Sequence, residues 1–126
     1  RIANGIQSLG FPRGSKVALL SKNCAHWIMA DLAIMMAGHV SVPLYATITA
    51  STIHQILEHS ESKLIIIGKL DDYSPQRQGI PANVVKLGVA AYGVDEDHSW
   101  EQWVKQFEPL KDTYTWKPEE LLTLVY

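Results

Sequence analysis

The 126-residue chain has little cysteine, no long apolar run and no excess of charge of one sign. Its one cysteine, Cys24, cannot form an internal disulfide or a cysteine-only metal site, so we expect a reducing, cytoplasmic location. No apolar run approaches the roughly 18 residues of a membrane span, and no basic segment followed by an apolar one opens the chain. With 11 lysines and arginines against 13 aspartates and glutamates, nucleic acid is not an expected partner.

The common motifs of nucleotide and metal enzymes are also missing. Gly5, Gly10 and Gly14 do not have GxGxxG spacing, and they precede the first expected strand. No glycine-rich loop leads into a Lys-Ser or Lys-Thr pair. His54 and His59 are five residues apart and so do not share a helix face, and we predict no metal site. No Ser-His-Asp order or carboxylate pair stands out, so no catalytic residue is named.

Strand-like and helix-like segments alternate along the chain. Short apolar segments predict strands at residues 16–21, 39–45, 63–68 and 84–89. The three consecutive isoleucines of KLIIIG are the strongest of these signals and predict a central strand with both faces buried. Pro43 has no N–H to donate, so its strand ends there or lies at an edge of the sheet. This alternation predicts an α/β fold, with a mostly parallel sheet and helices on both faces.

Three helices are expected between these strands and after them. Residues 25–37 are apolar almost all round, which predicts a largely buried helix. Ser51 is the expected cap of the next helix, and Ser99 with Gln102 has the capping-box spacing that begins a last one. Residues 71–83 collect Asp, Ser, Gly and two prolines, and we interpret them as an exposed loop.

Neither end of the chain has the pattern of a natural terminus. Residues 1–9 read as the tail of an amphipathic helix, and the apolar, β-prone run Leu121–Tyr126 stops without a turn. We interpret residues 1–126 as a single α/β fragment of a longer protein, truncated at both ends. Covering elements would then be missing around Leu121–Tyr126, and we expect self-association through this edge.

Several blocks of the sequence resemble the AMP-forming acyl-CoA synthetases. RGSKVALLSKNCAHWIMADLAIMMAGHVSVPLYAT, residues 13–47, is similar to the family's early strand, Trp-containing helix and Val-Pro-Leu-Tyr block, and IHQILEHSESKLIIIG, residues 53–68, to its next helix and strand. The terminal LLTLVY resembles the strand that runs into the phosphate-binding Tyr-Thr-Ser-Gly-Thr-Thr-Gly loop, whose first residue would be Tyr126.

The resemblance leaves residues 69–118 without a counterpart, and three positions depart from the pattern. Ser15 stands where Asp is common, His26 where Glu often precedes the Trp, and Ala46 where Pro often follows the Tyr. These departures leave the substrate subclass open, although the spacing of the blocks is most similar to the long-chain fatty-acid branch.

The resemblance implies a parent enzyme that activates a fatty acid with ATP and Mg and transfers the acyl group to coenzyme A. Of the implied cofactor-binding residues only Tyr126 falls within the chain, so we expect the fragment itself to be inactive. It would hold part of the large amino-terminal domain, including one wall of the acyl or coenzyme A site. A peripheral membrane location of the parent stays open. The alternative is a stand-alone, non-catalytic α/β interaction domain.

Overall fold

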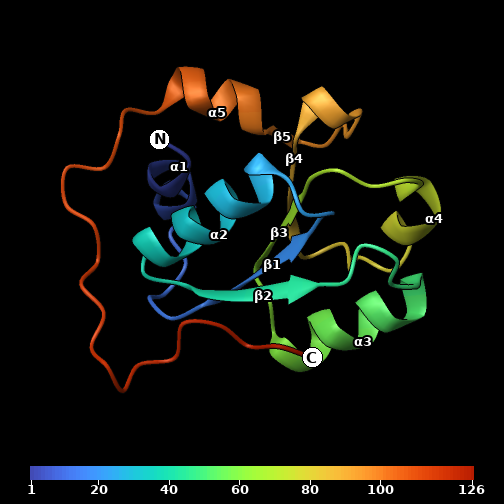
Figure 1. The fold of residues 1–126 in the computed structure, drawn as a ribbon, viewed down its shortest axis with the longest axis horizontal. Helices are drawn as coiled ribbons and strands as arrows, with labels where there is room; N and C mark the ends of the chain where they lie inside the picture. Colours follow the sequence, from blue (N-terminus) through green and yellow to red (C-terminus); the bar gives the residue numbers. More distant parts are fainter.

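A computed structural model describes residues 1–126, whose five strands form one parallel sheet in the order β2-β1-β3-β4-β5 (Figure 1). The strands are β1 (Lys16–Leu20), β2 (Val40–Leu44), β3 (Leu64–Ile67), β4 (Val85–Gly88) and β5 (His98–Ser99). The helices are α1 (Ile2–Ser8), α2 (Ala25–Met36), α3 (Ala50–Ser60), α4 (Tyr73–Arg77) and α5 (Trp100–Gln106), and a 3-10 turn, η1, covers Ala90–Tyr92.

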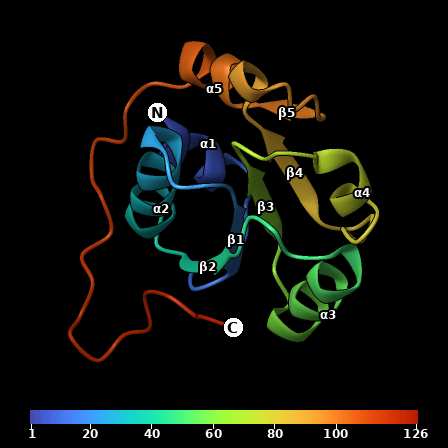
Figure 2. The same ribbon diagram turned by 45° about the vertical axis from the view of Figure 1, so that its right-hand side comes forward.

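Helices cover both faces of the sheet, as expected. Helices α1, α2 and α5 lie on one face, and α3 and α4 lie on the other (Figure 2). Because side chains alternate along a strand, Val17 and Leu19 of β1 join the first core and Ala18 and Leu20 join the second. The α/β prediction is therefore confirmed.

The central position of KLIIIG is confirmed as well. Strand β3 pairs with β1 on one side and with β4 on the other, and its four side chains are at most 1% exposed. Pro43 lies in β2 at the edge of the sheet, where its missing N–H costs no bond to β1.

Helix α2 is less buried than its apolar sequence predicts. Only the side toward the sheet and α1 is covered, while Ile28 and Leu32 are 59% and 53% exposed. The expectation of a largely buried helix is wrong because no element of the chain packs on the outer side of α2.

Two local expectations are also corrected. The interval 71–83 contains α4, whose Pro75 is the third helical residue and therefore sits in the first turn, where N–H groups have no intrahelical acceptor. Helix α3 is capped by Thr49 and not by Ser51. Thr49 has the extended backbone of a cap, and its hydroxyl accepts from the Thr52 N–H at 3.4 Å.

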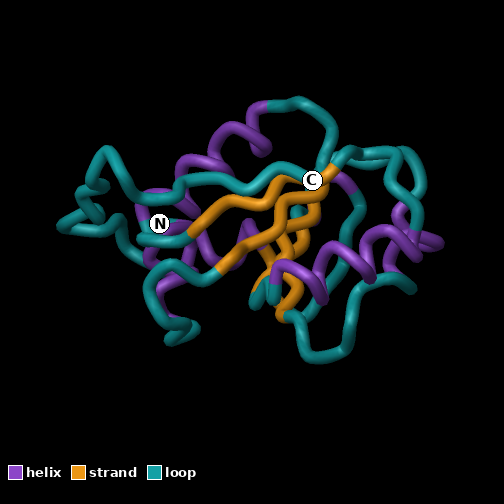
Figure 3. The backbone as a smooth tube through the Cα atoms, turned by 90° about the horizontal axis from the view of Figure 1, so that it is seen from below, coloured by secondary structure: helices purple, strands orange, loops and turns teal.

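Residues 108–126, which we call the strap, form no helix or strand and run along the outside of the molecule to the edge of β2 (Figure 3). Two bonds fix the strap to the end of α2. The Trp116 indole N–H donates to the Met35 carbonyl at 2.8 Å, and the Tyr114 N–H donates to the Met36 carbonyl at 3.2 Å. The Met35 carbonyl also accepts from the Gly38 N–H at 3.0 Å, so Trp116 adds a second bond there, while Tyr114 supplies a donor to the Met36 carbonyl at the helix end.

The strand expected at Leu121–Tyr126 is not formed. The run makes a single parallel bridge, between Thr123 and Ser41. The Ser41 N–H donates to the Leu122 carbonyl at 2.9 Å, and the Leu124 N–H donates to the Ser41 carbonyl at 2.8 Å. Pro43 is the next residue of β2 that faces outward, and its missing N–H ends the ladder after one bridge.

Candidate functional site

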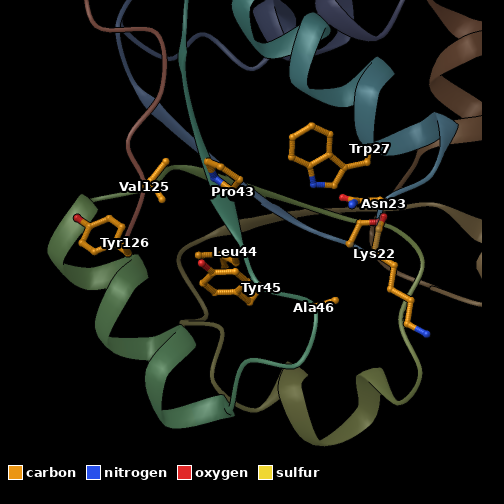
Figure 4. A pocket seen from close by; sticks show the side chains of 10 residues that line it. Lys22, Asn23, Trp27, Pro43, Leu44, Tyr45, Ala46, Val125 and Tyr126 are labelled. Carbon is orange, nitrogen blue, oxygen red and sulfur yellow. The ribbon is translucent and has the colours of Figure 1, made fainter.

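A cavity of about 380 Å³ opens at the carboxyl ends of β1 and β2 (Figure 4). In open parallel sheets, ligands bind outside the carboxyl ends of the strands. Its lining comes from the loop after β1, the end of β2, helix α2 and the strap: Ser21, Lys22, Asn23, Trp27, Pro43, Leu44, Tyr45, Ala46, Val125 and Tyr126. The sheet therefore brings residues about a hundred positions apart to one opening.

The lining of the cavity is amphipathic. Trp27, Tyr45 and Tyr126 place three aromatic rings around it, and Lys22 and Asn23 are the polar groups at one side (Figure 4). Pockets of about 300 to 1,000 Å³ with an apolar lining and a few polar groups are typical of small-molecule sites. This arrangement fits a ligand with an apolar body and a polar end.

The neighbouring crevice between the carboxyl ends of β1 and β3 is closed by the loops that follow them. The Lys22 N–H donates to the Lys69 carbonyl at 2.7 Å, and the Lys69 N–H donates to the Ser21 hydroxyl at 3.0 Å. A Cβ on Gly68 would lie 2.6 Å from the Ser21 Oγ, so the glycine allows this close approach. The Lys22 ammonium pairs with Asp71. These contacts close the crevice between β1 and β3, and the cavity described above opens beside it, on the β1 and β2 side.

Cys24 and His26 lie beside the cavity and not in its lining. His26 Nδ1 is 2.9 Å from the Tyr92 hydroxyl, and its ring packs edge-on against Tyr92 and Trp100. Burial raises the pKa of the Cys24 thiol, but hydrogen bonds from Ser21, the Trp27 N–H and Tyr92 outweigh it and lower that pKa. Both residues are held in a packed cluster at the start of α2.

Tyr126, the candidate cofactor-binding residue, forms part of the cavity wall and is 41% exposed. Its hydroxyl is 2.7 Å from Nδ1 of His59, near the end of α3. Sequence reasoning did not single out His59, Trp27 or Tyr45 for this site. Trp27 and Tyr45 lay within the block 13–47, but only the strand order shows that they share an opening with Tyr126.

Comparison with known proteins assigns the chain to a family. A family model described as AMP-binding enzyme matches residues 1–126. The chain belongs to this AMP-binding enzyme family. The resemblance to AMP-forming acyl-CoA synthetases noted in the sequence is thereby confirmed.

Individual relatives of this AMP-binding enzyme chain agree with the assignment. Over 145 residues it is 27% identical to long chain acyl-CoA synthetase 5 of Arabidopsis thaliana, covering 100% of the chain and 21% of that protein. A long-chain-fatty-acid–CoA ligase of Mycobacterium tuberculosis is 32% identical over 85 residues, which are 68% of the chain and 14% of the ligase. The chain thus spans a small part of the relatives it matches.

Solved structures share the fold of this segment. Coronafacic acid ligase of Pectobacterium brasiliense superposes with a TM-score of 0.81 at 21% identity, over 99% of the chain and 26% of the ligase. A long-chain-fatty-acid-CoA ligase of Archaeoglobus fulgidus gives a TM-score of 0.78 at 18% identity, over 99% of the chain and 25% of that protein.

The residues of this segment do not by themselves provide a site for a metal ion. No three His, Cys, Asp or Glu side chains are grouped to hold one. No carboxylate lines the cavity, and Asp71 is paired with Lys22 of the lining. None of the helices combines the length and apolarity that crossing a membrane requires.

Proposed function

We propose that this AMP-binding enzyme is a long-chain fatty-acid–CoA ligase. It would join a fatty acid to the AMP part of ATP with release of pyrophosphate, and then transfer the acyl group to the thiol of coenzyme A. Support comes from the family match over residues 1–126 and from the printed names of the Arabidopsis and mycobacterial relatives. The same match supports an enzyme segment over the stand-alone interaction domain.

Within such an enzyme, we propose that the cavity at the carboxyl edge is one wall of the acyl or coenzyme A site. The observation that carries this proposal is the meeting of Trp27, Tyr45 and Tyr126 around an opening of about 380 Å³. Aromatic rings suit an acyl chain or a flat base, and the amide of Asn23 suits a polar end. Tyr126 would stand at the first position of the phosphate-binding loop.

The first chemical step needs more than this segment supplies. Negative charge on the triphosphate must be stabilised by N–H donors, cations and a metal ion, and the residues present form neither a metal site nor a phosphate-binding loop. The isolated 126-residue chain should therefore release no pyrophosphate from ATP above a blank, with or without fatty acid. Turnover that stays with the protein through repurification would overturn this expectation.

The substrate proposal is tested on the longer polypeptide that contains the chain. Pyrophosphate release is measured without coenzyme A, and thioester formation with it, across fatty acids of increasing length. We expect both activities, with the highest kcat/KM for long chains. No fatty-acid-dependent pyrophosphate release at any chain length would contradict the ligase proposal.

The cavity proposal is tested in the same assays with Tyr45→Ala, and Leu32→Ala is the control. Both residues are exposed, but Leu32 lies on the outer side of α2, away from the cavity. If the cavity is a wall of the acyl site, Tyr45→Ala should raise the KM for fatty acid in the pyrophosphate assay. If it is a wall of the coenzyme A site, Tyr45→Ala should leave pyrophosphate release normal and slow thioester formation. An unchanged Tyr45→Ala enzyme would contradict both assignments.

A further inference from the structure

The strap loses its backbone contacts to the sheet just before it reaches the cavity. Its last main-chain bond to β2 runs from the Leu124 N–H to the Ser41 carbonyl at 2.8 Å. In a parallel ladder, the next bond would come from the N–H of Pro43, which does not exist. Beyond Leu124, therefore, something other than the sheet must fix the direction of the chain.

Helix α3 provides the contact that holds the chain beyond Leu124. His59 Nδ1 lies 2.7 Å from the Tyr126 hydroxyl, and the two rings meet edge-on with centroids 5.6 Å apart. No other hydrogen bond joins Val125 or Tyr126 to the rest of the chain. Figure 4 shows Tyr126 beside this helix, at the opposite side of the cavity from Lys22.

Helix α3 is a rigid support for such a contact. Ile53 and Leu57 are at most 2% exposed and anchor the helix in the second core. The other histidine of the helix, His54, pairs with Glu58 on the same helix at 3.0 Å. His59 has no carboxylate partner, so its imidazole is available to Tyr126.

We propose that His59 is a positioning residue that holds Tyr126 and so fixes both the cavity wall and the path of the chain that follows. This inference rests on the proposed function, in which Tyr126 opens the phosphate-binding loop. His59 touches no reacting group. It acts through the Tyr126 hydroxyl, and its loss would let Val125 and Tyr126 swing away from the opening.

A double-mutant cycle on the longer polypeptide tests the proposal. His59→Phe keeps an aromatic ring but removes the ring nitrogen that meets the Tyr126 hydroxyl, and Tyr126→Phe removes the hydroxyl. One exposed hydrogen bond predicts that each variant lowers kcat/KM for pyrophosphate release by about two- to tenfold. The double variant should be no worse than the poorer single one, because both changes break the same contact. His59→Asn, which retains a polar atom near the Nδ1 position, should recover part of the rate.

His54→Phe is the matched control, since it changes a histidine of the same helix that has no contact with the strap. It should leave the rate unchanged, and all variants should keep the wild-type melting temperature. Two outcomes would overturn the positioning role. One is a double variant whose fold-loss in kcat/KM equals the product of the two single losses, and the other is a His59→Phe enzyme with wild-type kcat/KM.

A separate measurement on the 126-residue chain distinguishes failure of this inference from failure of the proposed function. Nitrogen-15 NMR of the imidazole should show a hydrogen-bonded His59 Nδ1 whose signal moves in Tyr126→Phe and not in His54→Phe. An unmoved signal would refute the contact itself. A moved signal in a protein whose longer form releases no pyrophosphate would refute the ligase and, with it, the positioning role in that reaction.

Discussion

Strand β3 and the terminal run Leu121–Tyr126 have similar sequences and different structures. Both are short, apolar and rich in residues that favour strands. Strand β3 pairs on both sides and is buried between two layers of helices, whereas the terminal run has one bridge to β2 and is largely exposed. The difference lies in the partner edge, because β1 and β4 offer unbroken ladders to β3 while β2 presents Pro43.

The largest effect is expected from shortening a side chain of β3. Ile66 is 1% exposed, and Ile66→Ala removes its buried methyl groups and leaves a cavity, which should lower the free energy of unfolding by about 2 to 5 kcal/mol. Val125→Ala in the terminal run should change it by less than about 0.5 kcal/mol. Reversible denaturant titration measures both, and equal losses would remove the contrast between the two segments.

Acid should weaken the packed sheet through a buried histidine. His39 precedes β2 and is 2% exposed, Nδ1 has no hydrogen-bond partner, and burial lowers its pKa. The unfolded chain therefore binds a proton more readily than the folded one, so the free energy of unfolding should fall as the pH drops below about 6.5.

His39→Leu should flatten this decline between about pH 7 and pH 5, and His54→Leu, at an exposed position, serves as the control. Chemical denaturation across that range measures the slope. An unchanged slope in His39→Leu would show that the buried imidazole is not its source.

Restoring the missing N–H at the edge of β2 should make the backbone pairing of the terminal run more like that of β3. Pro43→Val restores an N–H that can donate to the Leu124 carbonyl, and the ladder could then continue toward Tyr126. We expect slower hydrogen exchange of the Tyr126 amide and a gain of about 0.5 to 1.5 kcal/mol in the free energy of unfolding. Exchange as fast as in the wild type would mean that Pro43 does not end the pairing.

The smallest effect is expected from association of the chain with itself. Leu121 and Leu122 are 51% and 37% exposed beside an unpaired edge, which a second copy of the chain could cover. Sedimentation equilibrium over a concentration series should show weak self-association that Leu121→Lys with Leu122→Lys abolishes. Ile28→Lys, on the exposed side of α2, should leave it intact. Loss of association only in Ile28→Lys would assign the contact to α2 instead.

Much of the fold could be predicted from sequence because local patterns and burial agree in the sheet. The burial of β3 follows from its run of isoleucines, and the edge position of Pro43 follows from its missing N–H. The cap at Ser99 follows from its spacing to Gln102. The exposed side of α2 could not be foreseen, because an apolar helix surface does not reveal whether anything packs on it. The strand expected at Leu121–Tyr126 failed because pairing depends on a distant partner.

The candidate site was less accessible to sequence reasoning. Tyr126 was singled out through the resemblance, and the structure places it at the cavity. Its neighbours Trp27 and Tyr45 come together there only through the order of β1 and β2, which periodicity does not specify. His59 is bound to Tyr126 across 67 positions of sequence, a contact without any local signal.

The coding sequence after the Tyr126 codon tests the central claim most directly. Sequencing the messenger RNA across this position shows whether the terminal run leads into a phosphate-binding loop. We predict that Thr-Ser-Gly-Thr-Thr-Gly, or a glycine-rich and hydroxyl-rich equivalent, follows Tyr126. A stop codon, or a continuation without such glycines and hydroxyl residues, would contradict the proposal that Tyr126 opens the phosphate-binding loop of a ligase.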